Sequence, residues 1–399
     1  MTYSAIAWVF GHDSARPVYF DHLAQAFLSG RLHLDPPPGT HDLSEFEGRW
    51  YVPFPPLPAL LMLPLVGLLG LDHVNSVYFS IGVGAGTAAL LWSLLDSLAV
   101  RRVVRLGPAG RIMLIAFFLL GTVHAYVAVE GSVWFLSQTC TVFFVALAAN
   151  CAIWFRSPLP ASLALGLAMA ARPHVLLCWP LLVGLARLRD DSPGSIRQSW
   201  LADCRAALTA KRRWIIGSLV GPALTIVSLS TYNYARFRDP LDFGYLSQKI
   251  EAGLMAPLFM EGQFSLAHVP RNLHVLLVQG RVRDHWTGRL VPSDVGMSVI
   301  LTSPALLWIF FALPRRNPAV RGAWMAAGLT LVPLLLYYNT GWRQFGYRFI
   351  LDLIVPLVVL LAVAAGRRIN PVLGVLLLVS IAVNLLGAFW WFTEVSLPS

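Results

Sequence analysis

The 399-residue sequence has few charged residues: Asp, Glu, Lys and Arg make up 13% of it, whereas 57% is hydrophobic. A soluble domain would carry roughly 25% charged residues, so this composition excludes an ordinary soluble protein. Repeated apolar runs of about 17–25 residues predict transmembrane helices. The short alternating segments of a membrane β-barrel are missing. The expected fold class is therefore an all-α polytopic membrane protein.

Lysine is nearly absent, because only Lys211 and Lys249 are found among the 30 basic residues and arginine supplies the rest. The net charge of +10 comes from short loops between apolar runs. Basic residues are expected at the cytoplasmic ends of transmembrane helices, so nucleic-acid binding is not predicted. Cysteine is also rare, and its four positions give neither a disulfide framework nor a metal-ligand spacing.

Several common motifs are missing as well. No Ser-His-Asp order, phosphate-cradling glycine loop or metal-ligand spacing rises above chance. Residues 1–10 are apolar but too short to span a membrane, and no basic leader precedes them, so no cleavable signal peptide is expected. A preceding first helix is expected to be truncated or lost. No repeat or soluble-domain boundary stands out, which predicts a single domain over residues 1–399.

Charge in the short loops predicts the orientation of the chain. The arginine-rich loops 101–111, 187–213, 314–321 and 367–369 all fall on one side when the chain alternates across the membrane. By the positive-inside rule that side is the cytoplasm. With helices before residue 75 included, about 10–12 transmembrane helices are expected. The clear spans cover about 75–100, 111–129, 133–154, 159–171, 175–188, 214–232, 295–313, 323–338, 349–366 and 371–391.

Two polar segments are expected to lie outside, a first external loop at 11–53 and a larger one at 233–294. Within the first, 19–32 has helical apolar spacing and a stop at Gly30, which predicts a helix lying on the membrane surface. The proline-broken run 54–71 either spans or enters and leaves on one side. Only the second alternative places 11–53 and 233–294 on the same side. The other alternative makes 11–53 cytoplasmic.

The stretch from Tyr337 to Asp352 lies at the predicted outer mouth of the helices and contains Arg343 and Arg348. Arginine's planar fork suits a phosphate, because it donates two hydrogen bonds at once. A helix beginning at about Trp342 would place Arg343 beside Tyr347, and Gln344 beside Arg348. Alternatives are a headgroup-facing anchor for Arg343, an Arg348–Asp352 ion pair, and an interfacial aromatic belt that includes Tyr338.

Further candidates lie at other outer positions. Asp42 and Asp13 each follow a histidine in the first loop, and a carboxylate there could accept a proton from an acceptor hydroxyl. Glu130 and Arg172 lie at outer helix ends, and Tyr245 lies in the large loop. These are candidate substrate contacts. The alternative for each acid and for the large loop is a solvated surface group, and for Glu130 a solvent-facing turn.

Four pieces of the sequence together resemble one family. They are 19–32 with His41-Asp42 and 47–56; 166–168 with Arg172-Pro173; 233–237 with Asp239-Pro240 and Gly244-Tyr245; and 343–348 with Leu351-Asp352. In these pieces, which span most of the chain, it resembles bacterial integral-membrane glycosyltransferases of the GT-C superfamily, related to protein O-mannosyltransferases and lipid A aminoarabinose transferases. The resemblance implies a GT-C-like helical bundle with external interfacial helices.

The resemblance also implies transfer of a sugar from a polyprenyl-phosphate carrier to a glycan, lipid or protein acceptor. A carboxylate of the first loop, Asp42 or Asp13, would act as base, and Arg343 and Arg348 would hold the carrier phosphate. Two features depart from the family pattern: the first helix is absent or truncated, and Asp13-Ser14 stands where an Asp-Glu pair is common. The identity of the base is therefore open between the two acids.

The function expected from the sequence is a glycosyltransferase of the inner (plasma) membrane, with its site facing the periplasm or exterior. The arginines are expected to replace a metal beside a lipid-monophosphate leaving group, so no metal or other cofactor is predicted; a divalent metal is possible but not indicated. A transporter or flippase of a lipid-linked sugar is the main alternative, and a non-catalytic scaffold is a third. A flippase needs no acid placed against an acceptor.

Overall fold

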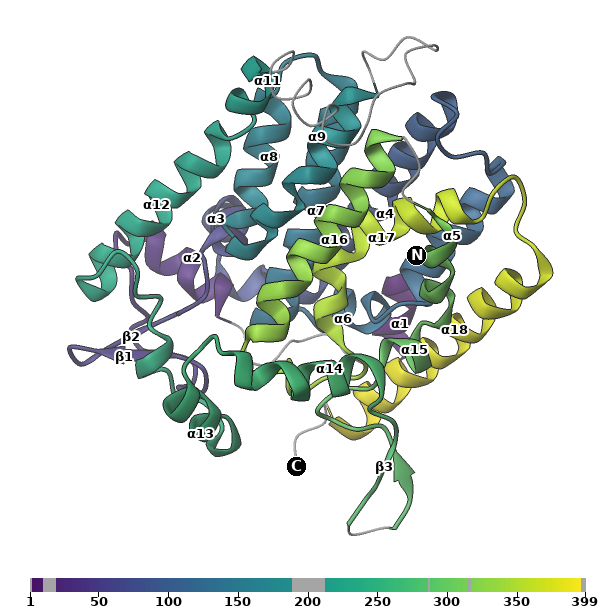
Figure 1. Ribbon diagram of the computed structural model, residues 1–399. Helices are drawn as coiled ribbons and strands as arrows, with labels where there is room; N and C mark the ends of the chain where they lie inside the picture. The colour runs from purple at the N-terminus through teal and green to yellow at the C-terminus, as the bar shows by residue number, and fades with distance from the viewer. Residues whose placement is uncertain (1, 10–18, 189–211, 286–287, 314–316, 396–399) are drawn as a thin grey trace.

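The computed structural model describes residues 2–9, 19–188, 212–285, 288–313 and 317–395, which form a bundle of helices with two small hairpins (Figure 1). The predicted all-α class is confirmed. The α-helices are α1 (Thr2–Val9), α2 (Phe20–Leu28), α3 (Leu57–Leu69), α4 (Ser76–Val100), α5 (Pro108–Leu120), α6 (His124–Glu130), α7 (Val133–Trp154), α8 (Leu159–Met169), α9 (Trp179–Arg187), α11 (Arg212–Gly217), α12 (Val220–Phe237), α13 (Ala252–Glu261), α14 (Val269–Leu277), α15 (Val299–Thr302), α16 (Pro318–Leu336), α17 (Ile354–Ala364) and α18 (Pro371–Trp390). Strands β1 (Ser44–Phe46) and β2 (Arg49–Tyr51) form one antiparallel hairpin, and β3 (Val282–Arg283) and β4 (Leu290–Val291) form another. Short turns of other helix types are η1 (Leu71–His73), η2 (Pro173–Cys178), η3 (Tyr245–Ser247), η4 (Leu266–His268), η5 (Pro304–Phe311), η6 (Arg348–Leu353) and η7 (Trp391–Val395).

Five helices of the described ranges are long and apolar enough to cross a membrane, and the bent pair α5–α6 gives up to six. The five are α4, α7, the stretch from α11 to α12, α16, and α18 with η7. The chain is therefore a multi-pass membrane protein. The predicted span 295–313 is instead divided into α15 and η5 at Pro304, because proline has no N–H to continue an α-helical ladder.

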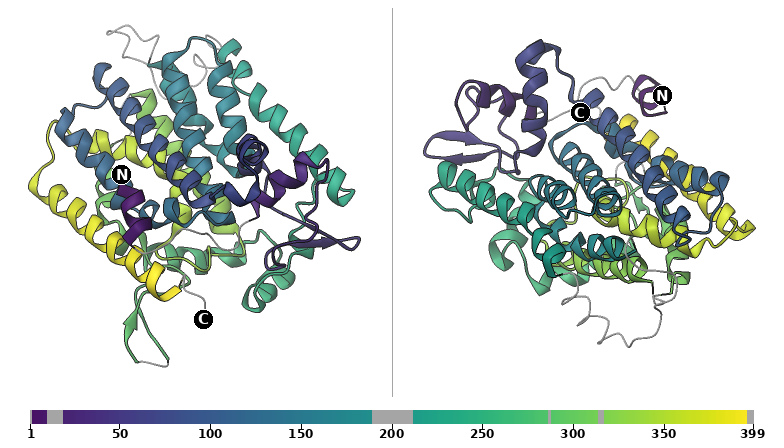
Figure 2. Two further views of the ribbon diagram at one scale, coloured as in Figure 1. Left: turned by 180° about the vertical axis from the view of Figure 1, so that it is seen from behind. Right: turned by 90° about the horizontal axis from the view of Figure 1, so that it is seen from above.

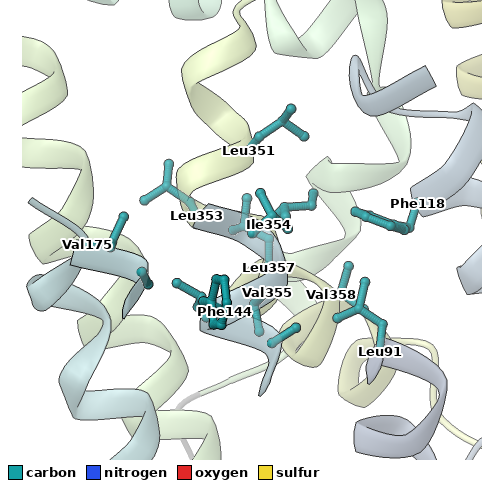
Figure 3. Close-up of a cluster of buried hydrophobic side chains, with 14 of the residues drawn as sticks. Leu91, Phe118, Phe144, Val175, Leu351, Leu353, Ile354, Val355, Leu357 and Val358 are labelled. Carbon is teal, nitrogen blue, oxygen red and sulfur yellow. The ribbon is translucent and has the colours of Figure 1, made fainter. Parts of the chain in front are cut away.

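The centre of the bundle is α17, whose residues from Ile354 to Ala362 are all buried. A helix that is apolar on every side needs neighbours on every side. It has them in α16, η5, α7, α5 and α4. Figure 3 shows Ile354, Leu357 and Val358 among side chains that include Leu91 of α4, Phe118 of α5 and Phe144 of α7. The segment η6 is buried and continues directly into α17, so the packed core fixes the position of Arg348 at its start.

Close helix contacts depend on small residues. A Cβ added at Gly184 of α9 would clash with the backbone of Pro318, and one at Gly322 of α16 would clash with the backbone of Pro180. Glycine at both positions lets the two helix backbones approach closely, as is common in membrane helix pairs. This packing fixes α16, whose end leads into the stretch from Tyr337 to Asp352.

Residues 19–53, the described part of the predicted first external loop, fold into defined elements. The helix predicted at 19–32 is α2, and the predicted stop at Gly30 is confirmed by its left-handed φ of 68°. Next, β1 and β2 are joined by Glu47-Gly48, whose φ values of 50° and 72° fit a two-residue hairpin turn. This hairpin and the chain leading from α12 to α13 lie together at one corner of the molecule (Figures 1 and 2).

Direct contacts show that the two segments predicted to be external loops lie on the same side of the bundle. The Asp42 N–H donates to the Lys249 carbonyl over 2.8 Å, and the Lys249 N–H donates to the Leu43 carbonyl over 2.9 Å. The Ser44 hydroxyl donates to the Gly244 carbonyl over 2.7 Å. The alternative that puts 11–53 opposite to 233–294 is therefore wrong. The length of α3 agrees with this, because its 13 residues extend only about 20 Å and are too short to cross the ~30 Å hydrocarbon layer.

Candidate functional site

Asp42 lies in the turn that precedes β1, with a left-handed backbone φ of 59°. Aspartate adopts this conformation more readily than most residues, but it is still uncommon. The turn is fixed by the Lys249 contacts and by Tyr19, whose hydroxyl donates to the His41 carbonyl over 2.5 Å. Backbone strain maintained by surrounding structure is typical of functional positions.

The carboxylate of Asp42 is largely buried and has two polar neighbours. Gln248 Nε2 donates to its Oδ1 over 3.1 Å, and His41 Nε2 lies 3.3 Å from its Oδ2. Burial raises the pKa of Asp42 to about 6, although His41, Arg348 and the Gln248 hydrogen bond act in the opposite direction. Asp42 is therefore ionised at neutral pH and more basic than an ordinary aspartate, as a general base requires.

The stretch from Gly341 to Tyr347 is an irregular turn, so the helix expected to begin at Trp342 is absent and regular structure starts only at η6. Gln344 organises this turn. Its Nε2 donates to the carbonyls of Val295 and Thr340 over 2.7 and 2.8 Å, and its Oε1 accepts from the Arg348 N–H over 2.9 Å. The Gln344 side chain has no exposed surface, and both its amide nitrogen and its amide oxygen are hydrogen-bonded. Its role is therefore to hold the turn together.

Arg348 follows this turn and is 5% exposed. Its Nε donates to the Gly341 carbonyl over 3.0 Å, whereas its Nη1 is buried without a hydrogen-bond partner. The guanidinium lies over the rings of Phe135 and Phe349, at 5.1 and 4.9 Å. No carboxylate of the described residues lies within ion-pair distance of it. A buried cation without an anion is costly, so this position suits an anionic ligand.

Asp352 does not pair with Arg348, so that alternative is wrong. Its Oδ2 lies 2.8 Å from Arg172 Nη2 and 2.9 Å from His174 Nε2, and its Oδ1 accepts from Gln138 Nε2 over 3.2 Å. Asp352 is 2% exposed. It therefore connects α7, η2 and η6 through one carboxylate and neutralises Arg172, whereas Arg348 has no carboxylate partner within the described ranges.

Arg343 is held more loosely than Arg348. Its side chain is 54% exposed, and its Nε lies 3.8 Å from Asp294 Oδ2. That carboxylate is already engaged by Trp342 Nε1 at 3.0 Å, and the guanidinium lies over the Trp342 ring. Arg343 is therefore the more exposed and less tightly held of the two arginines.

These groups surround one cavity of about 1160 Å³. It is lined by most of the predicted site residues, namely Asp42, Glu130, Arg172, Tyr245, Tyr338, Arg343 and Arg348. Gln344 and Tyr347 do not line it: Gln344 fixes the turn, and the Tyr347 ring is fully buried against Phe349. The prediction that they contact substrate is therefore corrected. Asp13 lies outside the described residues.

Glu130 lies at the end of α6 and is 3% exposed, so its alternative as a solvent-facing turn is wrong. Its carboxylate accepts from Trp391 Nε1 over 2.7 Å. Tyr338 is held by its backbone: its carbonyl accepts a hydrogen bond from the Arg271 guanidinium, and its N–H donates one to the Gln263 carbonyl. Tyr245 packs edge-on to Phe54. The two tyrosines give one part of the cavity wall an aromatic lining.

The cavity wall contains both polar and apolar side chains. Asp42, Arg172, His174 and Arg348 are polar, whereas the segment between α12 and α15 contributes apolar side chains, namely Leu241, Phe243, Ile250, Leu254 and Phe264. A charged group with an apolar chain attached would find partners of both kinds.

His174, Gln248 and Glu251 also line the cavity and were not predicted as site residues. His174 had a signal in the sequence, since it follows Arg172 in Arg172-Pro173-His174. Gln248 had none, because its role depends on the pairing of 248–249 with 42–44. Over the described ranges, no group of three His, Cys, Asp or Glu side chains is arranged to hold a metal ion.

The chain matches no protein-family model, no curated protein and no solved structure.

Proposed function

We propose that the protein is a membrane glycosyltransferase that moves a sugar from a polyprenyl-phosphate donor to a hydroxyl of a glycan, lipid or protein acceptor. One observation carries the proposal: a carboxylate suited to act as a base lines the same cavity as a buried guanidinium that has no carboxylate partner among the described residues. Arg348 is near enough for its charge to lower the pKa of Asp42, against the larger effect of burial. The resemblance to GT-C enzymes supports the same reaction.

In this proposal, Asp42 accepts the proton of the acceptor hydroxyl as its oxygen attacks the anomeric carbon. The new glycosidic C–O bond forms as the bond from the anomeric carbon to the phosphate oxygen breaks. Polyprenyl phosphate leaves with one more negative charge than it had as a diester. Arg348 and the more exposed Arg343 stabilise this charge where it develops, inside a site of low dielectric.

The proposed location is the inner (plasma) membrane, with the cavity open to the extracytoplasmic side. The C-terminal end of α9 and the N-terminal end of α16, which flank arginine-rich loops, lie at the top of Figure 1, and α13, α14 and the hairpins lie at the bottom. The positive-inside rule makes the top cytoplasmic. The apolar side chains of the wall would accept the start of the lipid chain.

A reconstituted assay tests the proposal. Purified protein in vesicles receives a radiolabelled polyprenyl-phosphate sugar and a cell-envelope extract. We expect label to appear in a new, lipid-free or larger product, and polyprenyl phosphate to be released in equal amount. Movement of intact donor across the vesicles without any release of polyprenyl phosphate would contradict the proposal and favour the flippase.

The pH dependence of transfer follows from Asp42. Its raised pKa of about 6 means that the carboxylate is protonated, and inactive as a base, below that pH. We expect kcat/KM to rise with pH through about 6 and then to level. Gln248→Leu removes a hydrogen bond that lowers the pKa, so the rise should move to higher pH. If the rise stays at the same pH in Gln248→Leu, the group whose titration controls the rate is not Asp42.

A further inference from the structure

His174 is one of the polar groups of the cavity that the proposed reaction does not yet use. It starts from η2, lines the cavity and is held by Asp352 through Nε2 at 2.9 Å. A carboxylate can only accept, so Nε2 carries the hydrogen. Its other ring nitrogen, Nδ1, has no hydrogen-bond partner among the described residues. An imidazole oriented in this way by a carboxylate presents its second nitrogen to a ligand.

The charges around His174 suit an anion whose charge increases during the reaction. Arg172 and Arg348 supply two positive charges and Asp352 one negative, so the cluster has a net charge of +1 when the imidazole is neutral and +2 when it is protonated. The imidazolium donates from both nitrogens, whereas the neutral ring with hydrogen on Nε2 has only a lone pair at Nδ1.

The sugar-linked and free forms of a carrier lipid differ in the charge of their phosphate. A sugar-linked phosphodiester has one negative charge, whereas a free phosphomonoester has about −1.5 to −2 at neutral pH. The second charge develops as the bond to the sugar breaks. Groups that bind the more charged form better stabilise the transition state more than the ground state.

We infer that Arg172, His174 and Arg348, supported by Asp352, form a site that binds a lipid phosphomonoester more tightly than the corresponding phosphodiester. This inference rests on the proposed function and identifies the charge state that the site selects. His174 supplies the selectivity as the imidazolium: with Nε2 donating to Asp352, a proton taken up from solvent when the monoester binds lets Nδ1 donate a hydrogen bond to the additional anionic oxygen. Arg348 supplies affinity for both forms.

Two substitutions distinguish the role of Nε2 of His174 from the role of Nδ1. In His174→Gln the amide can reach Asp352 as Nε2 does, but no donor faces the cavity. In His174→Asn the shorter amide can place a donor near the position of Nδ1, while the contact with Asp352 is lost. Binding of a short-chain prenyl monophosphate and of its methyl diester is measured on the full chain in detergent. Thermal unfolding confirms that each variant is folded.

We expect the wild-type protein to bind the monoester about tenfold or more tightly than the diester, which corresponds to about 1.4 kcal/mol. His174→Gln should reduce this ratio to near one with little change in diester affinity, and His174→Asn should retain part of it. Equal wild-type affinity for the two esters, or a ratio unchanged in His174→Gln, would overturn the inference and leave the lipid-phosphate function standing. Failure of the wild-type protein to bind either ester would instead reject the proposed function.

Discussion

Asp42→Asn is expected to lower the rate of sugar transfer by about 10²–10⁴-fold, the usual contribution of a positioned base. The substitution keeps the size of the side chain and leaves a hydrogen-bonding group beside Gln248, but the amide cannot accept the acceptor proton. Donor affinity should change little, because the phosphate contacts belong to Arg348 and its neighbours. The measurements are kcat and KM for transfer, with donor affinity from direct binding.

Glu45→Gln is the matched control for Asp42→Asn. Glu45 lies three residues away in β1, is exposed and does not line the cavity, so its change should leave the rate within a factor of about two. Equal loss in both variants would indicate a general effect on the first external loop. Transfer that survives Asp42→Asn would remove Asp42 from the reaction and leave Asp13 as the sequence candidate for the base.

Arg348→Met is expected to abolish measurable donor binding without unfolding the protein. Removing a buried charge that contacts a ligand costs about 2–5 kcal/mol, or about 30-fold or more in affinity. The empty protein should keep its thermal stability or gain some, because no carboxylate of the described part of the chain pairs with the guanidinium and Nη1 has no hydrogen bond. The measurements are a binding titration with polyprenyl phosphate and a melting curve without ligand.

Asp352→Asn gives the contrasting result, because it removes the anion from an existing buried pair. The Arg172 guanidinium would then lose its ion-pair partner, which costs about 3–5 kcal/mol of stability. Arg343→Met, at an exposed position, should weaken binding less than Arg348→Met. A large loss of stability in Arg348→Met with unchanged donor affinity would make Arg348 a structural residue and contradict its assignment.

The sequence predicted those parts of the fold that depend on local patterns. Helical apolar spacing and Gly30 predicted α2 and its end, and apolar runs predicted the long helices such as α4 and α7. The side of the membrane shared by 11–53 and 233–294 remained open, because proline-broken α3 is compatible with either path. The backbone pairing of Asp42 and Leu43 with Lys249, about 200 residues away in sequence, decides it.

The sequence predicted which residues belong to the candidate site better than it predicted how they are arranged. The arginine and aromatic residues of 337–352 were recognised, but helical spacing was applied to a stretch that folds as an irregular turn around Gln344. The Arg348–Asp352 ion pair, an alternative suggested by a spacing of four residues, does not form. The partners of Asp352 are Arg172 and His174 at the start of η2, and no local spacing reports such contacts.

A structure of the protein with a bound polyprenyl-phosphate sugar is the most direct test that the acid of the first loop and the guanidinium groups near the C-terminal end serve one reaction. We expect the phosphate within about 3 Å of Arg348 and the sugar between it and Asp42, in the cavity described here. A donor bound outside this cavity, or with its sugar turned away from Asp42 and separated from it by packed helices, would contradict the proposed reaction.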